Sequence, residues 1–248
     1  MRIAVLGLGE AGGRIAADLV AAGCSVRGWD PVRRPDGIVA AESDVAAVRG
    51  ADVVLSVNAA SVALDLARGV AGELGDETLY ADLNTSSPRL KRELAATLPV
   101  EFADVALVGV VPRDGLATPS LASGSGAEPF ADLFRPLGMP VEVDGAEPGV
   151  AAGLKLLRSV FMKGVAAAAL ESLAAARAAG AEERVRADIA AIIGEPLLER
   201  LLAGSRLHAA RRAEEMRAAA EYIAELGVDP RVAAAAAEWL AQLRDEGG

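Results

Sequence analysis

The chain has 248 residues, a formal net charge of −10 at pH 7 and an isoelectric point near 4.8. Such an acidic chain lacks the basic surface that nucleic acids require, so we expect no nucleic-acid partner. The single cysteine, Cys24, excludes an intrachain disulfide, and one histidine among scattered acids leaves no set of metal ligands. No uninterrupted apolar run reaches about 18 residues, and Met1 directly precedes a predicted strand; we therefore expect a cytoplasmic protein without a membrane segment.

The first predicted strand runs directly into a glycine-rich turn and then into a helix. Residues 7–12 read Gly-Leu-Gly-Glu-Ala-Gly, the G-x-G-x-x-G spacing of a dinucleotide-binding loop. In such a loop the first glycine permits a tight turn, the second lets the backbone approach a pyrophosphate, and the third lets the helix pack against the strand. The free amides at the helix N-terminus bind the anion. We therefore predict cofactor contacts from Gly7, Leu8, Gly9, Glu10, Ala11 and Gly12.

A second predicted strand, residues 25–29, ends in Asp30, about 20 residues beyond the glycine loop. A carboxylate at this place accepts hydrogen bonds from the adenosine ribose 2′-OH and repels a 2′-phosphate, which favours NAD. Arg33 and Arg34 follow and could bind a phosphate instead, so NADP remains possible.

Strand-like and helical segments alternate through the first half, which is typical of an α/β fold with a doubly wound parallel sheet of the Rossmann type. Further strands are expected at 52–58, 78–82, 100–108 and 140–144, helices at 61–74, 88–98 and 128–134, and a loop over 111–126. Ligands bind outside the carboxyl ends of the strands in such sheets. Asn58, Asn84 and Thr85 should therefore line one crevice with the glycine loop.

The character of the sequence changes near residue 146. Every later predicted element is helical and alanine-rich, with helices at 148–179, 182–193, 196–202, 208–226 and 230–243. We therefore expect two domains, a dinucleotide-binding domain over residues 1–146 and an all-helical domain over residues 147–248. About 100 residues of small side chains make a thin core, so we expect the helical domain to be buried against a second subunit in a homodimer.

The long predicted helix carries three basic residues and no acidic residue between Glu147 and Glu171. Lys155, Ser159 and Lys163 follow at intervals of four residues and share a face, with Arg158 beside them. A positive cluster on an apolar helix indicates an anion in a cleft, and partial burial of a lysine brings it closer to proton transfer at neutral pH. The alternative is that these lysines extend to water from a packed helix.

The order of these features resembles the β-hydroxyacid dehydrogenase superfamily, which includes 6-phosphogluconate, 3-hydroxyisobutyrate and tartronate semialdehyde dehydrogenases and the imine reductases. The resemblance is carried by the N-terminal glycine loop, by residues 82–88 and 104–109, and by the long helix that opens at residues 149–155. Residues 155–164 and 208–216 are similar to a phosphogluconate-dehydrogenase-like branch of this superfamily.

The resemblance implies that Lys155 is the catalytic lysine, which moves the proton of the substrate hydroxyl while hydride passes to or from a nicotinamide. It also implies that Thr85 holds the nicotinamide ribose side and that Ser123 and Gly124 lie near the substrate. Arg212 would contact the cofactor from the C-terminal helices.

Two departures from the family pattern affect the substrate pocket. Residues 108–110 read Val-Gly-Val in place of Ser-Gly-Gly, and Arg158 and Ser159 replace paired asparagines. We therefore predict that Ser159 acts beside Lys155 in catalysis and that Arg158 and Lys163 bind substrate. An arginine can bind a carboxylate or phosphate through two hydrogen bonds, which favours an acidic substrate.

These features predict an NAD(P)-dependent oxidoreductase that acts on a small hydroxyacid or another anionic hydroxy compound, with Lys155 as the acid/base. Two alternatives remain: an imine reductase, in which Lys155 only positions an anion, and a dinucleotide-binding protein without catalytic activity. His208 either caps or packs its helix or joins the substrate site.

Overall fold

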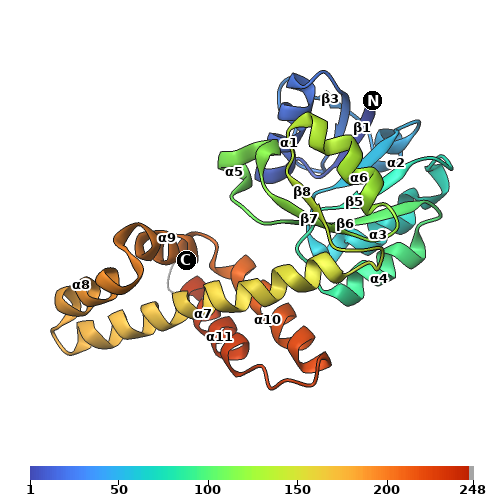
Figure 1. Ribbon diagram of the computed structural model, residues 1–248. Helices are drawn as coiled ribbons and strands as arrows, with labels where there is room; N and C mark the ends of the chain where they lie inside the picture. The colour runs from blue at the N-terminus through green and yellow to red at the C-terminus, as the bar shows by residue number, and fades with distance from the viewer. Residues whose placement is uncertain (246–248) are drawn as a thin grey trace. The chain divides into compact units, whose positions relative to one another are not determined.

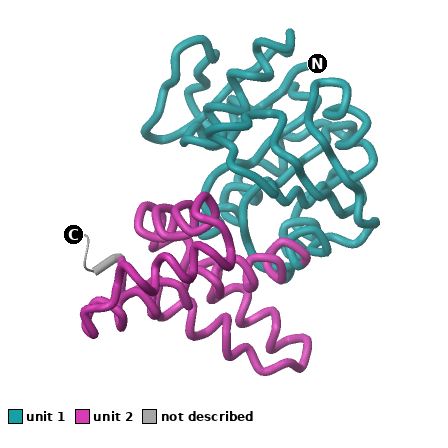
Figure 2. Tube along the Cα trace, turned by 60° about the vertical axis from the view of Figure 1, so that its left-hand side comes forward, with its two compact units in different colours: residues 1–153 teal, residues 154–248 magenta. Residues whose placement is uncertain are grey.

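The computed structural model describes residues 1–245, and the chain divides into two compact units, Met1–Gly153 (unit 1) and Leu154–Gly248 (unit 2) (Figure 2). Unit 1 contains all the strands, and unit 2 is helical wherever it is regular in the described range. The predicted fold class, a Rossmann-type α/β region followed by an all-helical region, is confirmed.

Unit 1 is built on one eight-stranded sheet with the order β3-β2-β1-β4-β5-β6-β7-β8 (Figure 1). The strands are β1 (Arg2–Leu6), β2 (Ser25–Trp29), β3 (Val39–Ala40), β4 (Val53–Ser56), β5 (Leu79–Asp82), β6 (Glu101–Leu107), β7 (Ser120–Ser123) and β8 (Val141–Val143). Neighbouring strands are parallel except β6 and β7. The strand order reverses between β1 and β4, and in such sheets this switch point is where ligands bind.

Helices cover both faces of the sheet. They are α1 (Glu10–Ala21), α2 (Asp44–Val48), α3 (Ala60–Val70), α4 (Pro88–Thr97), α5 (Val111–Asp114) and α6 (Ala127–Phe134), with short 3₁₀ turns at Ala71–Glu73, Gly115–Ala117 and Arg135–Leu137. Along β1, Ile3 and Val5 enter one apolar cluster and Ala4 and Leu6 the other. The first cluster takes residues from α1 and α6, and the second from α2, α3 and α4. Burial on both faces explains why β1 and β4 are continuous apolar runs.

The predicted loop over residues 111–126 is wrong in two parts, because Val111–Asp114 form the short helix α5 and Ser120–Ser123 form β7. This strand is only four residues long, begins and ends in serine, and is flanked by proline and glycine, so its local pattern is that of a loop. Pairing on both sides, antiparallel to β6 and parallel to β8, stabilises the strand despite its composition.

Unit 2 consists of most of α7 (Val150–Ala178), followed by α8 (Glu182–Ile193), α9 (Glu195–Leu207), α10 (Ala209–Glu225) and α11 (Arg231–Asp245). The helix predicted at 196–202 therefore continues to Leu207. Two apolar clusters hold the unit together, an alanine-rich one between α7, α10 and α11 and a leucine-rich one between α7, α8 and α9.

Helix α7 begins in unit 1, to which its first turn belongs, and continues through unit 2. Among the described residues it is the one helix that is long and apolar enough to cross a membrane. This is weak evidence for a membrane span, because the core helices of soluble proteins have the same length and composition. Lys155, Arg158 and Lys163 interrupt its apolar sequence.

Candidate cofactor and catalytic site

The glycine loop is closed on the protein side and open on the other. Gly7 has a φ of +104°, and a Cβ added there would lie 2.3 Å from the Val57 carbonyl oxygen. A Cβ at Gly12 would lie 2.0 Å from the Gly7 carbonyl oxygen, whereas one at Gly9 would meet nothing within 4 Å. The space at Gly9 therefore allows a ligand to approach the backbone, as the pyrophosphate of a dinucleotide requires.

The N-terminus of α1 faces this opening without a side-chain cap. Gly9 is the N-cap residue and makes no side-chain hydrogen bond. Leu8 is buried, Ala11 is half-buried, and Glu10 is exposed in the first turn. Amides at an uncapped helix N-terminus, together with the helix dipole, favour an anion there. The predicted loop residues therefore surround an uncapped helix N-terminus, and their contacts with a dinucleotide stay a prediction.

Asp30 ties the glycine loop to the end of β2. Its carboxylate accepts hydrogen bonds from the backbone amides of Leu8 (2.8 Å), Val32 (2.9 Å) and Arg33 (2.9 Å). Burial raises the pKa of Asp30, but these amides and the charge of Arg33 outweigh burial and lower the pKa below its ordinary value. Arg34 donates to the backbone carbonyls of Asp30 and Arg33. Asp30 is therefore a charged carboxylate at neutral pH, held beside the loop.

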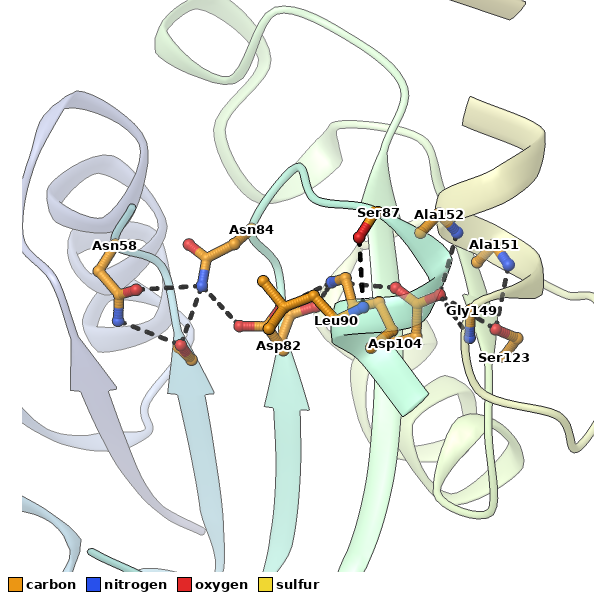
Figure 3. Close-up of polar contacts among 12 residues, drawn as sticks. Asn58, Asp82, Asn84, Ser87, Leu90, Asp104, Ser123, Gly149, Ala151 and Ala152 are labelled. Carbon is orange, nitrogen blue, oxygen red and sulfur yellow. Dashed lines mark hydrogen bonds and ion pairs between the residues drawn. The ribbon is translucent and has the colours of Figure 1, made fainter. Parts of the chain in front are cut away.

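Polar side chains meet at the carboxyl ends of β4 and β5 (Figure 3). Asn84 Nδ2 lies 3.1 Å from Ser56 Oγ, 3.1 Å from Asn58 Oδ1 and 2.5 Å from Asp82 Oδ1. Asn58 Nδ2 donates to Ser56 Oγ at 3.1 Å. The structure thus brings Asn58 and Asn84 together at the strand ends, as predicted, and Thr85 follows as an exposed residue. Asn84 Oδ1 is buried without a hydrogen-bond partner in the described part of the chain.

Lys91 is a buried charged residue that no motif in the sequence indicates. Its side chain, and those of Asp82 and Asp104, are fully buried. Lys91 Nζ lies 2.6 Å from Asp82 Oδ2, 2.8 Å from the Asp82 carbonyl oxygen and 3.0 Å from Asp104 Oδ1. Burial lowers the pKa of Lys91, but the charges of Asp104 and Asp82 outweigh burial and raise the pKa above its ordinary value. Lys91 is therefore an ammonium group between two strand ends.

Ser123 is the last residue of β7 and Gly124 follows it, both within unit 1. Ser123 is fully buried; its hydroxyl donates to Asp104 Oδ2 at 3.3 Å and accepts from the Ala151 amide at 3.0 Å. Gly124 has a φ of +106°, and a Cβ added there would lie 2.5 Å from the Phe102 carbonyl oxygen. Both residues therefore have structural contacts here, and their place near the substrate stays a prediction.

In unit 2, Ser159 and Lys163 share one partner on α10. Ser159 Oγ donates to Glu215 Oε1, and Lys163 Nζ lies 2.9 Å from the same oxygen and 3.2 Å from Ser159 Oγ. Burial lowers the pKa of Lys163, and the attraction of Glu215 offsets only part of this change. The cluster expected from α7 alone is positive, but in the structure it also contains the carboxylate of Glu215. This residue lies on α10, so no spacing within α7 could indicate it.

The charge of Lys155 also affects the pKa of Glu215. Burial raises the pKa of Glu215, but the charges of Lys163 and Lys155 and the hydrogen bonds from Lys163 and Ser159 lower it below its ordinary value. Lys155 is half-buried on α7, one turn before Ser159, and Arg158 is exposed. The predicted catalytic and substrate-binding residues of α7 therefore gather around Glu215, except Arg158, which faces solvent.

The remaining predicted residues of unit 2 lie at the start of α10. Arg212 is half-buried and donates from Nη1 to Ser205 Oγ at 3.1 Å. Burial lowers the pKa of Arg212, and the nearby charge of Glu215 partly offsets this effect. His208 is the N-cap residue of α10.

Comparison with known families covers most of the chain. Residues 2–111 match the model of the NAD binding domain of 6-phosphogluconate dehydrogenase. Residues 176–243 match a domain of unknown function, DUF1932. The first match contains the glycine loop, Asp30 and the polar residues at the strand ends, and the second contains Glu215.

A curated relative, an uncharacterized 28.5 kDa protein of Methanothermus fervidus from the 5′ region of 7S RNA, is 30% identical over 68% of this chain and 66% of its own length. A solved structure, a conserved hypothetical protein of Sinorhizobium meliloti, is 30% identical over 97% of this chain and 87% of that chain, with a TM-score of 0.76. Another, a conserved protein described as structurally similar to 3-hydroxyacid dehydrogenases, is 31% identical over the full length of both chains, with a TM-score of 0.74.

Two more distant structures share the fold. Mycobacterium tuberculosis 3-hydroxyisobutyrate dehydrogenase is 22% identical over 99% of this chain and 94% of that chain, with a TM-score of 0.80. A Myxococcus stipitatus imine reductase in complex with NADP+ is 20% identical over 100% of this chain and 95% of that chain, with a TM-score of 0.69. The glycine loop, the two family models and the relatives that are 30–31% identical over nearly the whole chain agree: the chain belongs to a 6-phosphogluconate dehydrogenase-like family, in which an N-terminal dinucleotide-binding domain of this type precedes a DUF1932 domain.

Proposed function

We propose that this protein is a nicotinamide-dinucleotide-dependent oxidoreductase that transfers hydride between its cofactor and a small hydroxyacid or another anionic hydroxy compound. The observation that carries the proposal is the glycine loop, which is closed at Gly7 and Gly12 and open at Gly9, in front of an uncapped helix. The match of residues 2–111 to a 6-phosphogluconate dehydrogenase domain supports the same cofactor class. The similarity to a 3-hydroxyisobutyrate dehydrogenase supports this type of substrate.

Lys155 is the proposed acid/base. A bound nicotinamide would supply the position that accepts or donates hydride. In the oxidative direction, neutral Lys155 Nζ takes the proton of the substrate hydroxyl as the C–O bond becomes C=O. In the reductive direction, the Lys155 ammonium returns that proton to the alkoxide oxygen. Ser159 and Lys163 hold Glu215 beside this face of α7, so a carboxylate stays near Lys155 during both steps.

The substrate carries a carboxylate or phosphate in this proposal, and Arg158 binds it. Arg158 is exposed on α7 and close in sequence to Lys155. Lys163 is paired with Glu215 at 2.9 Å, so its charge is largely balanced within the protein. Arg158 is therefore the better candidate for a two-pronged contact with an anion.

The cofactor is NAD in this proposal, with NADP as the alternative. The lowered pKa of Asp30 keeps its carboxylate charged, and that charge would repel a 2′-phosphate. Arg34 already donates to backbone carbonyls of its own turn. The side chain of Arg33 is then the cation that NADP would use.

The test uses the full-length protein. NADH and NADPH binding is measured by fluorescence titration, followed by turnover assays with hydroxyacids, phosphorylated sugar acids and cyclic imines. We expect turnover of at least one hydroxyacid, and Lys155→Met should lower kcat by about 100-fold or more while the nucleotide Kd changes by less than about threefold. Arg177→Met, a change on the same helix far from Lys155, is the matched control and should leave kcat unchanged.

Three results would contradict the proposal in different ways. Turnover of cyclic imines but of no hydroxyacid indicates an imine reductase. Nucleotide binding without turnover, unaffected by Lys155→Met, indicates a binding protein without catalytic activity. Absence of binding to both nucleotides removes the basis for any dehydrogenase.

A further inference from the structure

The first turn of α7 is capped by the sheet and not by its own chain. The amides of Gly149 and Ala152 both donate to Asp104 Oδ2, at 3.2 and 2.9 Å, and the Ala151 amide donates to Ser123 Oγ. Amides at a helix N-terminus have no partner within the helix, so β6 and β7 satisfy most of them here. A carboxylate at this end is also favoured by the helix dipole. Asp104 therefore fixes where α7 begins.

Lys91 holds the other oxygen of Asp104. Its ammonium lies 3.0 Å from Asp104 Oδ1 and 2.6 Å from Asp82 Oδ2, so it joins the ends of β6 and β5. The opposite oxygen of Asp82 contacts Asn84, which in turn contacts Asn58 at the end of β4. Figure 3 shows the result, a continuous chain of polar contacts from the first turn of α7 to the strand ends beside the glycine loop.

The backbone packs closely at the same point. Gly149 has a φ of +97°, and a Cβ added there would lie 2.7 Å from the Pro88 carbonyl oxygen. Pro88 is the first residue of α4, and Ser87 caps this helix by accepting from the Leu90 amide at 3.2 Å. Lys91 lies on the next turn of α4. The starts of α4 and α7 therefore meet over the strand ends, and Lys91 connects them electrostatically.

We propose that Lys91, with Asp82 and Asp104, is a positioning device that fixes the first turn of α7 on the strand ends of unit 1, and that the acid/base role of Lys155, three residues beyond this turn, depends on that fixation. Lys155 follows Ala152 by about 4.5 Å along the helix axis, so a tilt or shift of the first turn displaces Lys155 as well. Lys91 touches neither substrate nor cofactor in this account, and it acts through Lys155. The inference rests on the proposed function, which assigns Lys155 as the acid/base.

Buried charges suit this task better than apolar side chains. An apolar replacement would fill the same space, but it would not direct bonds to particular oxygen atoms, and pairs of buried charges are known to specify one arrangement in some proteins. Among the described residues, the group consists of one cation and two anions, and the N-terminal amides of α7 face the excess negative charge.

The test combines hydrogen exchange with kinetics on the full-length protein. Variants are Lys91→Met and Asp104→Asn, the second of which keeps an oxygen acceptor for the Ala152 amide in case the first does not fold. Leu94→Ala is the matched control, since Leu94 is fully buried one turn later on the same helix, where its side chain, which has no polar atoms, packs in the apolar cluster shared by α2, α3 and α4. We expect exchange of the amides of residues 149–152 to be at least about tenfold faster in both test variants than in the control.

The kinetic arm separates positioning from general destabilisation. Lys91→Met should lower kcat by about tenfold or more, while the Kd for NADH changes by less than about threefold. In the Lys155→Met background, the same change should lower kcat by less than about twofold, because the residue through which Lys91 acts is gone.

Each other outcome overturns a defined part of the proposal. Unchanged exchange at residues 149–152 shows that Lys91 does not fix α7. Faster exchange with an equal loss of kcat in both backgrounds shows a structural role alone and refutes the link to Lys155. A parent protein that binds NADH but turns over no substrate refutes the proposed function, and the exchange result then decides the anchoring of α7 by itself.

Discussion

The Asp30 carboxylate offers the sharpest test of cofactor preference, and Asp30→Asn is the variant to make. One carboxylate oxygen accepts from Val32 and Arg33, and the other accepts from Leu8 in the glycine loop. Asparagine has nearly the same shape and keeps one acceptor, so it can retain the pair of bonds within its own turn. Alanine would remove all three bonds, whereas asparagine loses only the bond from the Leu8 amide.

The magnitude follows from charge and hydrogen bonding. Two unit charges 4 Å apart repel by about 1 kcal/mol in water and about 4 kcal/mol at an effective dielectric constant near 20, and half-buried Asp30 lies between these limits. Removing the charge should therefore strengthen NADPH binding by an amount within this range, and about 1.4 kcal/mol corresponds to about tenfold. NADH loses hydrogen bonds to a charged acceptor, worth about 1.5 kcal/mol or more, so it should bind about tenfold more weakly. The ratio of the two affinities should shift by about 100-fold.

The assay is fluorescence titration of NADH and NADPH against the parent, Asp30→Asn and a control, Asp36→Asn. Asp36 is exposed in the following loop, so its substitution makes the same change in net charge. A shift of the affinity ratio of less than about threefold in Asp30→Asn refutes the assignment of Asp30 to the ribose. An equal shift in Asp36→Asn shows a general charge effect. Thermal unfolding of each variant confirms that the loop is still folded.

Gly12→Ala places a Cβ 2.0 Å from a backbone oxygen and should weaken NADH binding by at least about tenfold. Gly13→Ala is the control, because its Cβ would have a nearest contact of 3.3 Å and should weaken binding less. Equal effects of the two substitutions would contradict the packing argument. Glu215→Gln removes the negative charge that partly offsets the effect of burial on Lys163, so the pKa of Lys163 should fall further. Acetylation of Lys163 at neutral pH, measured by mass spectrometry, should then become at least about threefold faster. Slower acetylation would show that Glu215 does not act on Lys163 through its charge. The predicted homodimer would bury Phe161, which is 71% exposed, so Phe161→Glu should yield monomers in light scattering, and a monomeric parent would contradict the dimer.

The glycine loop and the strand ends beside it were predictable because their signals are local. The glycine spacing, the strand before it and Asp30 all lie within one β-α-β unit, and the structure gives Gly7 and Gly12 the close contacts that this spacing requires. The polar residues at the strand ends followed from the rule that parallel strands deliver their carboxyl ends to one edge. Asn58 and Asn84, 26 positions apart, meet there through a 3.1 Å hydrogen bond.

The electrostatic partners were not predictable in the same way. Lys163 pairs with Glu215, 52 positions later and on another helix, so no periodicity within α7 could indicate the pairing. Strand β7 is specified by its neighbours β6 and β8 and not by its own four residues. Lys91 does have a signal in the composition of the chain. The chain contains only three lysines, and arginine supplies the rest of its positive charge, so each lysine was a candidate for a special position.

The oxygen atoms around the side chain of residue 91 explain why this residue is a lysine and not an arginine. The ammonium group donates hydrogen bonds to two oxygen atoms of Asp82 and forms an ion pair with Asp104 Oδ1 at 3.0 Å, so it serves atoms on two strands at once. A guanidinium is larger and planar, and its donors suit two parallel bonds to one carboxylate better than bonds to atoms on two strands. Lys91→Arg keeps the charge but not this geometry, so exchange at residues 149–152 should be as fast as in Lys91→Met. Exchange at the parent's rate in Lys91→Arg would instead show that charge alone holds Asp104 in place, and the start of α7 would then depend on neutralisation and not on directed bonds.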